Sequence, residues 1–164
     1  MTKVVSTPDP DIPDSFAWRQ ASHILFCPSL DSAKAFINNH HSSFPDSRRL
    51  LCIPIGLIPS KAVIQAYNPR LKNKKIILLM PDDLLGRIAD IKLAAWLRNN
   101  NVQLTYCQPG TIQIAFKNKT YHFPEHKTSL SAFEKASGFR SKIRTYKISV
   151  PNPNVYSASG PRTS

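Results

Sequence analysis

The segment KKIILLMPDDLLGRIADIKLAAWLRNNNVQL, residues 74–104, contains a strand, a helix and a second strand in that order. The apolar run at 76–80 is typical of a strand that is buried on both faces of a sheet. Residues 84–97 then carry apolar side chains at helical spacing, and the asparagines at 99–101 end that helix. Because residues 102–107 again have the composition of a strand, the segment predicts two parallel strands joined by a crossover helix.

Two units of the same kind precede this segment. The apolar runs HILFC at 23–27 and LLCIPI at 50–55 are each followed by a helical pattern, which begins near Ser29 or Asp31 in the first unit and at Ser60 in the second. Strands connected through helices lie parallel in one sheet, with the helices on both of its faces. We therefore predict an α/β fold with an open, mostly parallel four-stranded sheet, whose strands are 23–27, 50–55, 76–80 and 102–107.

The region after Gly110 has a different pattern. The segment TIQIAFKNKTYHF, residues 111–123, alternates apolar and polar side chains around Lys117, which predicts a C-terminal β-hairpin that extends an edge of the sheet. A short helix at 129–136 and a basic strand or arm at 142–150 follow. The predicted organisation is a disordered arm at 1–17, one domain at 18–150 with a basic extension at 111–150, and a disordered tail at 151–164.

The charge of the chain indicates its partner. Its 164 residues include 22 lysines and arginines against 10 acidic residues, so the formal net charge is +12. Such an excess attracts polyanions, which makes DNA or RNA the first partner to expect. Over half of the excess follows Gly110, and the predicted nucleic-acid contacts are Lys117, Lys119, Arg140, Lys142, Arg144 and Lys147, the last four with solvated side chains. The aromatic residues between these cations either stack on unpaired bases or fill the core; they are Tyr121, Phe123, Phe139 and Tyr146.

The compartment follows from the cysteines and from the hydropathy pattern. Cys27, Cys52 and Cys107 each lie in a predicted strand, where they behave as small core side chains in a reducing compartment. The N-terminal residues lack the apolar core of a signal peptide, and no later run reaches the ~20 apolar residues of a membrane helix. We predict a cytoplasmic protein without a membrane partner.

Three segments together resemble the Toprim domain of topoisomerases and primases. HILFCPSLDSAKAF at 23–36 is similar to the first strand and helix of that domain, and LLCIPIGLIPSKAVIQAY at 50–67 is similar to its connecting unit. Residues 74–104 resemble its second half, with an acidic turn after the strand and Gly86 three residues beyond the last acid. The resemblance covers about residues 22 to 108 and implies a Toprim/Rossmann-like sheet.

The resemblance also implies a degenerate metal site. Toprim enzymes hold Mg²⁺ with a Glu after the first strand and a D-x-D turn after the third, because hard carboxylate oxygens suit this cation. Here Cys27 stands at the Glu position and Pro81 at the first Asp. Asp83 matches the second Asp, Asp82 lies between the two, and Asp31 matches an acidic position of the first helix. These three aspartates are the candidate Mg²⁺ ligands, and their alternative role at a helix start is to cap free amide groups.

The predicted function is that of a non-catalytic nucleic-acid-binding protein on a degenerate Toprim-like scaffold, accessory to DNA replication, mobilisation or repair, with no bound cofactor. One alternative is a metal-dependent nuclease or primase in which Asp82 replaces a missing acid. The other is a protein-interaction subunit whose basic surface contacts an acidic partner. The pairs His40–His41 and His122–His126 lack the further ligands of a zinc site, so we expect them at the surface.

Overall fold

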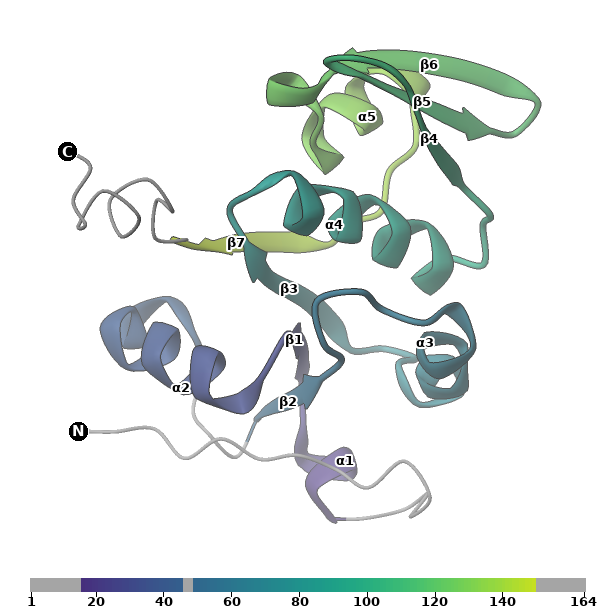
Figure 1. Cartoon of the computed structure of the whole chain (residues 1–164). Helices are drawn as coiled ribbons and strands as arrows, with labels where there is room; N and C mark the ends of the chain where they lie inside the picture. The colour runs from purple at the N-terminus through teal and green to yellow at the C-terminus, as the bar shows by residue number, and fades with distance from the viewer. Residues whose placement is uncertain (1–15, 46–48, 150–164) are drawn as a thin grey trace, which may run out of the picture.

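The computed structural model describes residues 16–45 and 49–149 (Figure 1). The predicted arms at 1–17 and 151–164 lie outside these residues, except that Phe16 and Ala17 begin a short helix. The helices are α1 Phe16–Gln20, α2 Leu30–Asn39, α3 Lys61–Tyr67, α4 Leu84–Leu97 and α5 Leu130–Ser137, with 3-10 turns at His41–Ser43, Asn68–Arg70 and Glu125–Lys127.

A four-stranded parallel sheet forms the centre of the molecule, in the order β2-β1-β3-β7. Its strands are β1 His23–Cys27, β2 Leu50–Pro54, β3 Lys75–Pro81 and β7 Arg144–Ile148. Every neighbouring pair is parallel. The predicted fold class, an α/β protein with a four-stranded parallel sheet, is therefore confirmed.

Helices cover both faces of this sheet, as the continuous apolar strands require. On one face, Phe26 and Leu78 pack in a buried cluster with Ile64 of α3 and Leu93 of α4. On the other face, the alternate strand residues pack against α2, where Ile37 is fully buried. Ser29 caps α2 by accepting a hydrogen bond from the Ser32 amide, which confirms Ser29 rather than Asp31 as the cap.

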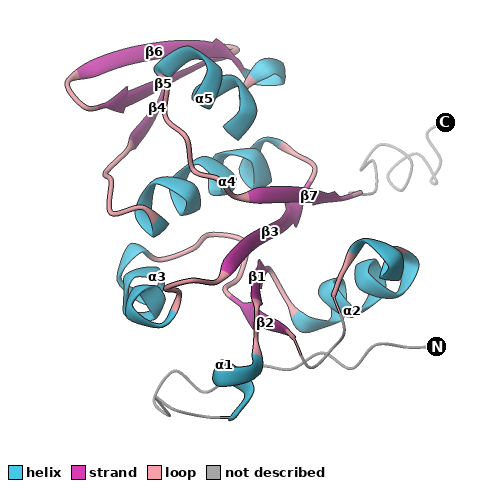
Figure 2. Cartoon of the chain, turned by 180° about the vertical axis from the view of Figure 1, so that it is seen from behind, coloured by secondary structure: helices cyan, strands magenta, loops and turns pink. Residues whose placement is uncertain are grey.

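A separate antiparallel sheet is inserted between α4 and β7 (Figure 2). It consists of β4 Gln103–Gln108, β5 Thr111–Phe116 and β6 Lys119–Pro124, in the order β4-β5-β6. The β5–β6 pair is the predicted hairpin, and its turn has positive φ at both Lys117 and Asn118. The hairpin pairs with β4 and does not extend an edge of the parallel sheet, so that part of the prediction was wrong.

The fourth strand of the parallel sheet is also not the predicted one. Residues 102–107 were expected there, but they form β4 of the antiparallel sheet, and β7 takes the place beside β3. The reason is burial, because a strand of the central sheet must be apolar on both faces. β4 instead alternates polar and apolar residues, most of its side chains are exposed, and Leu104 packs against the core of the second sheet. As an edge strand, β7 is covered less completely, so Arg144 at its start is exposed and Lys147 is tolerated between Tyr146 and Ile148.

Helix α4 joins the two sheets because it lies between them, as Figure 1 shows. Its Leu93 and Trp96 pack on the parallel sheet. Its Ile91 and Ala94 pack in a second core with Ile114 of β5 and with residues of α5. A helix that is apolar around most of its circumference is typical of such a position between two layers.

Candidate nucleic-acid interface

The predicted metal ligands lie at the carboxyl end of the parallel sheet. Asp83 caps α4, since its Oδ1 accepts a hydrogen bond of 2.7 Å from the Gly86 amide. Asp82 is exposed, and its amide donates to the Ile148 carbonyl at 2.8 Å. Asp31 is exposed in the first turn of α2. The capping alternative is thus realised for Asp83.

The two positions that the resemblance aligned with Toprim acids, Cys27 and Pro81, carry no side-chain oxygen for Mg²⁺. Cys27 is fully buried, and burial raises the pKa of its thiol to about 12. Pro81 has no side-chain oxygen. Within residues 16–45 and 49–149, no group of three or more His, Cys, Asp or Glu residues is placed to hold a metal ion.

The opposite end of the sheet contains a cavity of about 490 Å³. Three strands of the parallel sheet begin there, because His23, Lys75 and Arg144 are the first residues of β1, β3 and β7. We call this cavity the basic pocket. Its described lining includes five cations and no carboxylate; the cations are Lys74, Lys75, Arg98, Lys142 and Arg144. An arrangement of this charge attracts anions.

Hydrogen bonds hold several of these cations in place. The Lys74 ammonium donates to the carbonyls of Trp18 and Ala21, at 2.7 and 2.6 Å, and so fastens α1 beneath the sheet. Arg98 Nε donates to the Ser141 carbonyl at 2.7 Å, which uses one of the five guanidinium N–H groups. Lys75 and Lys142 are exposed. The pocket therefore combines fixed cations with cations that can adjust to a ligand.

The positive charges around the basic pocket act on the pKa of His23. Burial lowers the pKa of this imidazole, and the positive charges of Lys75, Arg144 and Arg49 lower it further. His23 is consequently neutral at pH 7, with Nδ1 2.8 Å from the Ser22 hydroxyl.

This field predicts a measurable response of His23 to charge removal. NMR titration is expected to give His23 a pKa below 6.5, and the double variant K75Q/R144Q should raise it because two repelling cations are removed. The control K34Q/K72Q removes two exposed lysines that do not line the pocket and should leave it unchanged. A pKa that does not rise in K75Q/R144Q would contradict this account of the field.

The positive surface continues beyond the pocket through Lys142. This residue also lines a neighbouring cavity of about 530 Å³, together with Lys135 and Arg140. The carboxylate in that cavity, Glu134, accepts hydrogen bonds from the amide and the hydroxyl of Ser141, at 2.8 and 2.6 Å. We define the basic surface as Lys75, Arg98, Lys135, Arg140, Lys142 and Arg144.

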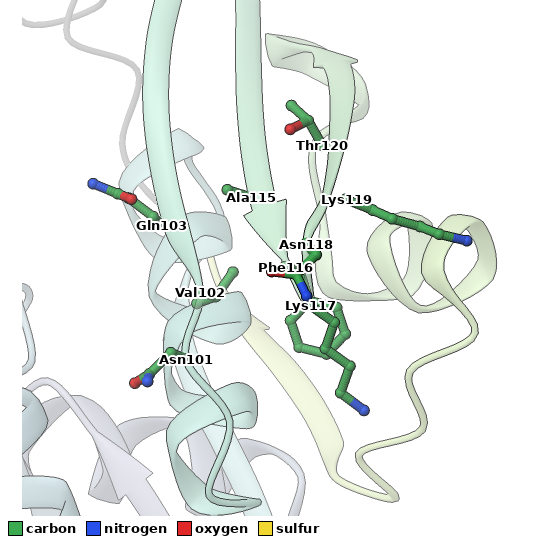
Figure 3. Close-up of a pocket in the computed structure, with 9 residues that line it drawn as sticks. All are labelled: Asn101, Val102, Gln103, Ala115, Phe116, Lys117, Asn118, Lys119 and Thr120. Atoms are coloured by element: carbon green, nitrogen blue, oxygen red, sulfur yellow. The ribbon is translucent and has the colours of Figure 1, made fainter.

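Two of the predicted contacts, Lys117 and Lys119, lie in a third cavity at the turn of the β5–β6 hairpin. This cavity has a volume of about 620 Å³. Figure 3 shows the residues that line it, which come from this turn and from the segment that leads into β4. The two amines extend in different directions (Figure 3). Lys117 Nζ lies 5.2 Å from the centre of the Phe116 ring.

Lys147 differs from the other predicted contacts. It is 26% exposed, and its ammonium forms an ion pair with the carboxylate of Asp90, which is 2% exposed on α4. The expectation of a solvated side chain was therefore wrong for this residue. The sequence offers no sign of the pair, because its members are far apart in the chain and meet only where β7 packs against α4.

The aromatic residues of the basic extension pack in the cores. Phe139 is buried, with ring centres 5.4 Å from Phe116 and 6.0 Å from Phe133. Tyr121 contacts Phe133 edge to face, and Tyr146 packs on Phe44 at 5.0 Å. For Phe139, Tyr121 and Tyr146 the structure therefore favours the alternative in which the aromatic ring fills a core.

Sequence reasoning missed His23, Lys74, Lys75 and Arg98 as members of the site. The candidate metal ligands predicted from the sequence follow the carboxyl ends of strands, where parallel sheets commonly bind ligands, and the basic pocket lies at the other end. A usable signal was present, because the pair Lys74–Lys75 directly precedes an apolar strand. Parallel strands begin at one common edge, so cations before several strands come together.

Among the described helices, none has both the length and the apolar character needed to cross a membrane. In comparisons with known proteins, no family model, no curated protein and no solved structure matches this chain.

Proposed function

We propose that this chain binds nucleic acid through the basic surface and does not itself catalyse phosphoryl transfer. The observation that carries the proposal is the basic pocket, in which five cations converge without a described carboxylate. Phosphate groups neutralise such cations, and the release of condensed counterions favours binding. Cations that line one cavity repel one another in the free protein, and a bound anion relieves this repulsion.

The proposal of a non-catalytic role rests on the Toprim-like positions. A buried thiol at Cys27 and a proline at Pro81 replace two anionic ligands, and neither supplies the hard oxygen that Mg²⁺ requires. Together with the resemblance, the missing ligands favour an accessory role in DNA replication, mobilisation or repair over a catalytic one. The basic pocket lies at the opposite end of the parallel sheet from these positions, so the proposed binding does not require them.

The test is the triple variant R140Q/K142Q/R144Q, measured against DNA and RNA strands over a range of salt concentrations. Removing three phosphate contacts should flatten the slope of log K against log salt by about 2 to 3 and weaken binding about 100-fold near physiological salt. These side chains are exposed, so the unfolding transition should not change. Lys147 is left intact because it pairs with the buried carboxylate of Asp90.

The matched control is K34Q/K61Q/K72Q, which removes the same charge from exposed lysines outside the three cavities. It should retain nearly the parental affinity. Equal losses in both triple variants would mean that net charge, and not the basic surface, determines affinity. If the parent binds neither DNA nor RNA at physiological salt, the proposal fails and an acidic protein partner becomes the leading candidate.

A further inference from the structure

The basic pocket has the size of a site for one nucleotide unit. Its volume of about 490 Å³ falls in the range of roughly 300 to 1,000 Å³ that is typical of small-ligand sites. The interior of a nucleic acid strand, by contrast, passes along a protein surface and presents its phosphates one after another. A recess at one end of the sheet suits a group that enters it endwise.

The charge in the pocket exceeds what one phosphodiester requires. A phosphodiester carries one negative charge, whereas a phosphomonoester carries about −1.5 to −2 at pH 7 and has three strong acceptor oxygens. Lys75, Arg98 and Arg144 supply cationic donors from three different segments around the recess. A dianion gains more than a monoanion from such a convergent set.

The remaining lining is consistent with a phosphate that carries an organic group. The neutral imidazole of His23 and the hydroxyl of Ser43 add polar groups, and Ile76 and Ile77 contribute apolar surface next to them. Because His23 Nδ1 is engaged with Ser22, Nε2 is the ring nitrogen that remains for a ligand.

We infer that the basic pocket binds a phosphomonoester, and that its source is the phosphorylated end of a nucleic acid strand. The inference rests on the proposed function and extends it. The proposed function requires only that the protein binds nucleic acid strands, whereas the inference adds that it prefers their phosphorylated ends. The wider basic surface, from Lys142 to Arg140 and Lys135, then contacts the phosphodiesters that follow the end.

The experiment compares short single strands of one sequence that end in a 5′-phosphate, in a 3′-phosphate or in hydroxyls only. The parent should bind one of the phosphorylated strands about tenfold more tightly than the hydroxyl strand. The pocket variant K75Q/R144Q should lose this preference. The matched variant K135Q/R140Q, which removes the same charge outside the pocket, should weaken all strands and keep the preference.

Equal affinity of the parent for all three strands would overturn the inference and leave the proposed function intact. So would a preference that survives in K75Q/R144Q. If no strand binds, the proposed function fails instead. In that case a nucleoside monophosphate is tested alone. Binding that is lost in K75Q/R144Q would support a phosphomonoester site for a free nucleotide. The absence of binding would overturn the phosphomonoester site altogether.

Discussion

Replacing Lys147 by methionine is expected to lower the free energy of unfolding by about 2 to 3 kcal/mol at pH 8. The substitution keeps an unbranched side chain of similar length but leaves the buried carboxylate of Asp90 without its charge partner. The other oxygen of this carboxylate, Oδ1, has no hydrogen-bond partner among the described groups. A buried charge without compensation is among the costliest defects in a folded protein.

The loss should depend on pH in a defined direction. Burial raises the pKa of Asp90 from 3.8 to about 6, although Lys147 acts to lower it. The folded chain therefore retains a proton that the unfolded chain releases between about pH 4 and 6, so the contribution of Asp90 to stability falls as pH rises through this window. Removing Lys147 raises this pKa further, so the deficit of K147M should already shrink as the pH falls from 8 toward 6, and it should be small at pH 5, where Asp90 is protonated in both folded proteins.

Urea unfolding at pH 5 and pH 8 measures both effects, and D90N is the control. This variant removes the titrating carboxylate, so it should lose the pH dependence that Asp90 causes. It should also destabilise less than K147M at pH 8, because the partly exposed Lys147 can reach water. If K147M is as stable as the parent at pH 8, the ion pair does not compensate the buried charge.

Replacing Gly86 by alanine is expected to cost about 3 kcal/mol of stability. A Cβ atom at this position would lie 1.9 Å from the carbonyl oxygen of Pro81, and this neighbour is backbone that cannot rotate away. Alanine is favoured over glycine inside a helix by about 1 kcal/mol. The steric clash exceeds this gain, because the first turn of α4 must move away from the end of β3.

Gly110→Ala is the matched control for this substitution. Gly110 has a positive φ of 83°, but a Cβ there would meet nothing within 4 Å. Only the cost of a left-handed conformation applies, about 1 to 2 kcal/mol. Denaturant unfolding of both variants compares a clash with backbone strain alone, and a G86A protein no less stable than G110A would contradict the close contact between α4 and Pro81.

Gly86 was part of the resemblance noted in the sequence. The close contact of this position with the Pro81 carbonyl gives a physical reason for a glycine there. The acidic turn before it has a physical reason as well, since Asp83 caps α4. Both features therefore have a role in joining β3 to α4. The Toprim resemblance itself stays a proposal, because these local requirements would hold in any fold that makes the same tight turn.

The sequence by itself determined the strands β1, β2 and β3, the helix that follows each of them, and the β5–β6 hairpin. These elements are specified locally: continuous apolar runs require burial on both faces, helical spacing produces one apolar side, and Lys117 and Asn118 occupy a tight turn. Caps such as Ser29 and Ser129 were also near expected helix starts. Short-range patterns of this kind depend on neighbours in the chain.

The tertiary structure decided which strand completes the parallel sheet, where the cations gather and which of them is buried. Residues 102–107 and β7 have similarly mixed compositions, and only packing around α4 assigns one to each sheet. The basic pocket joins Lys75, Arg98 and Arg144 because the strands begin at one edge. Asp90 and Lys147 meet across the contact of α4 with β7. Such pairings are set by long-range packing of a common core, which no local pattern of residues contains.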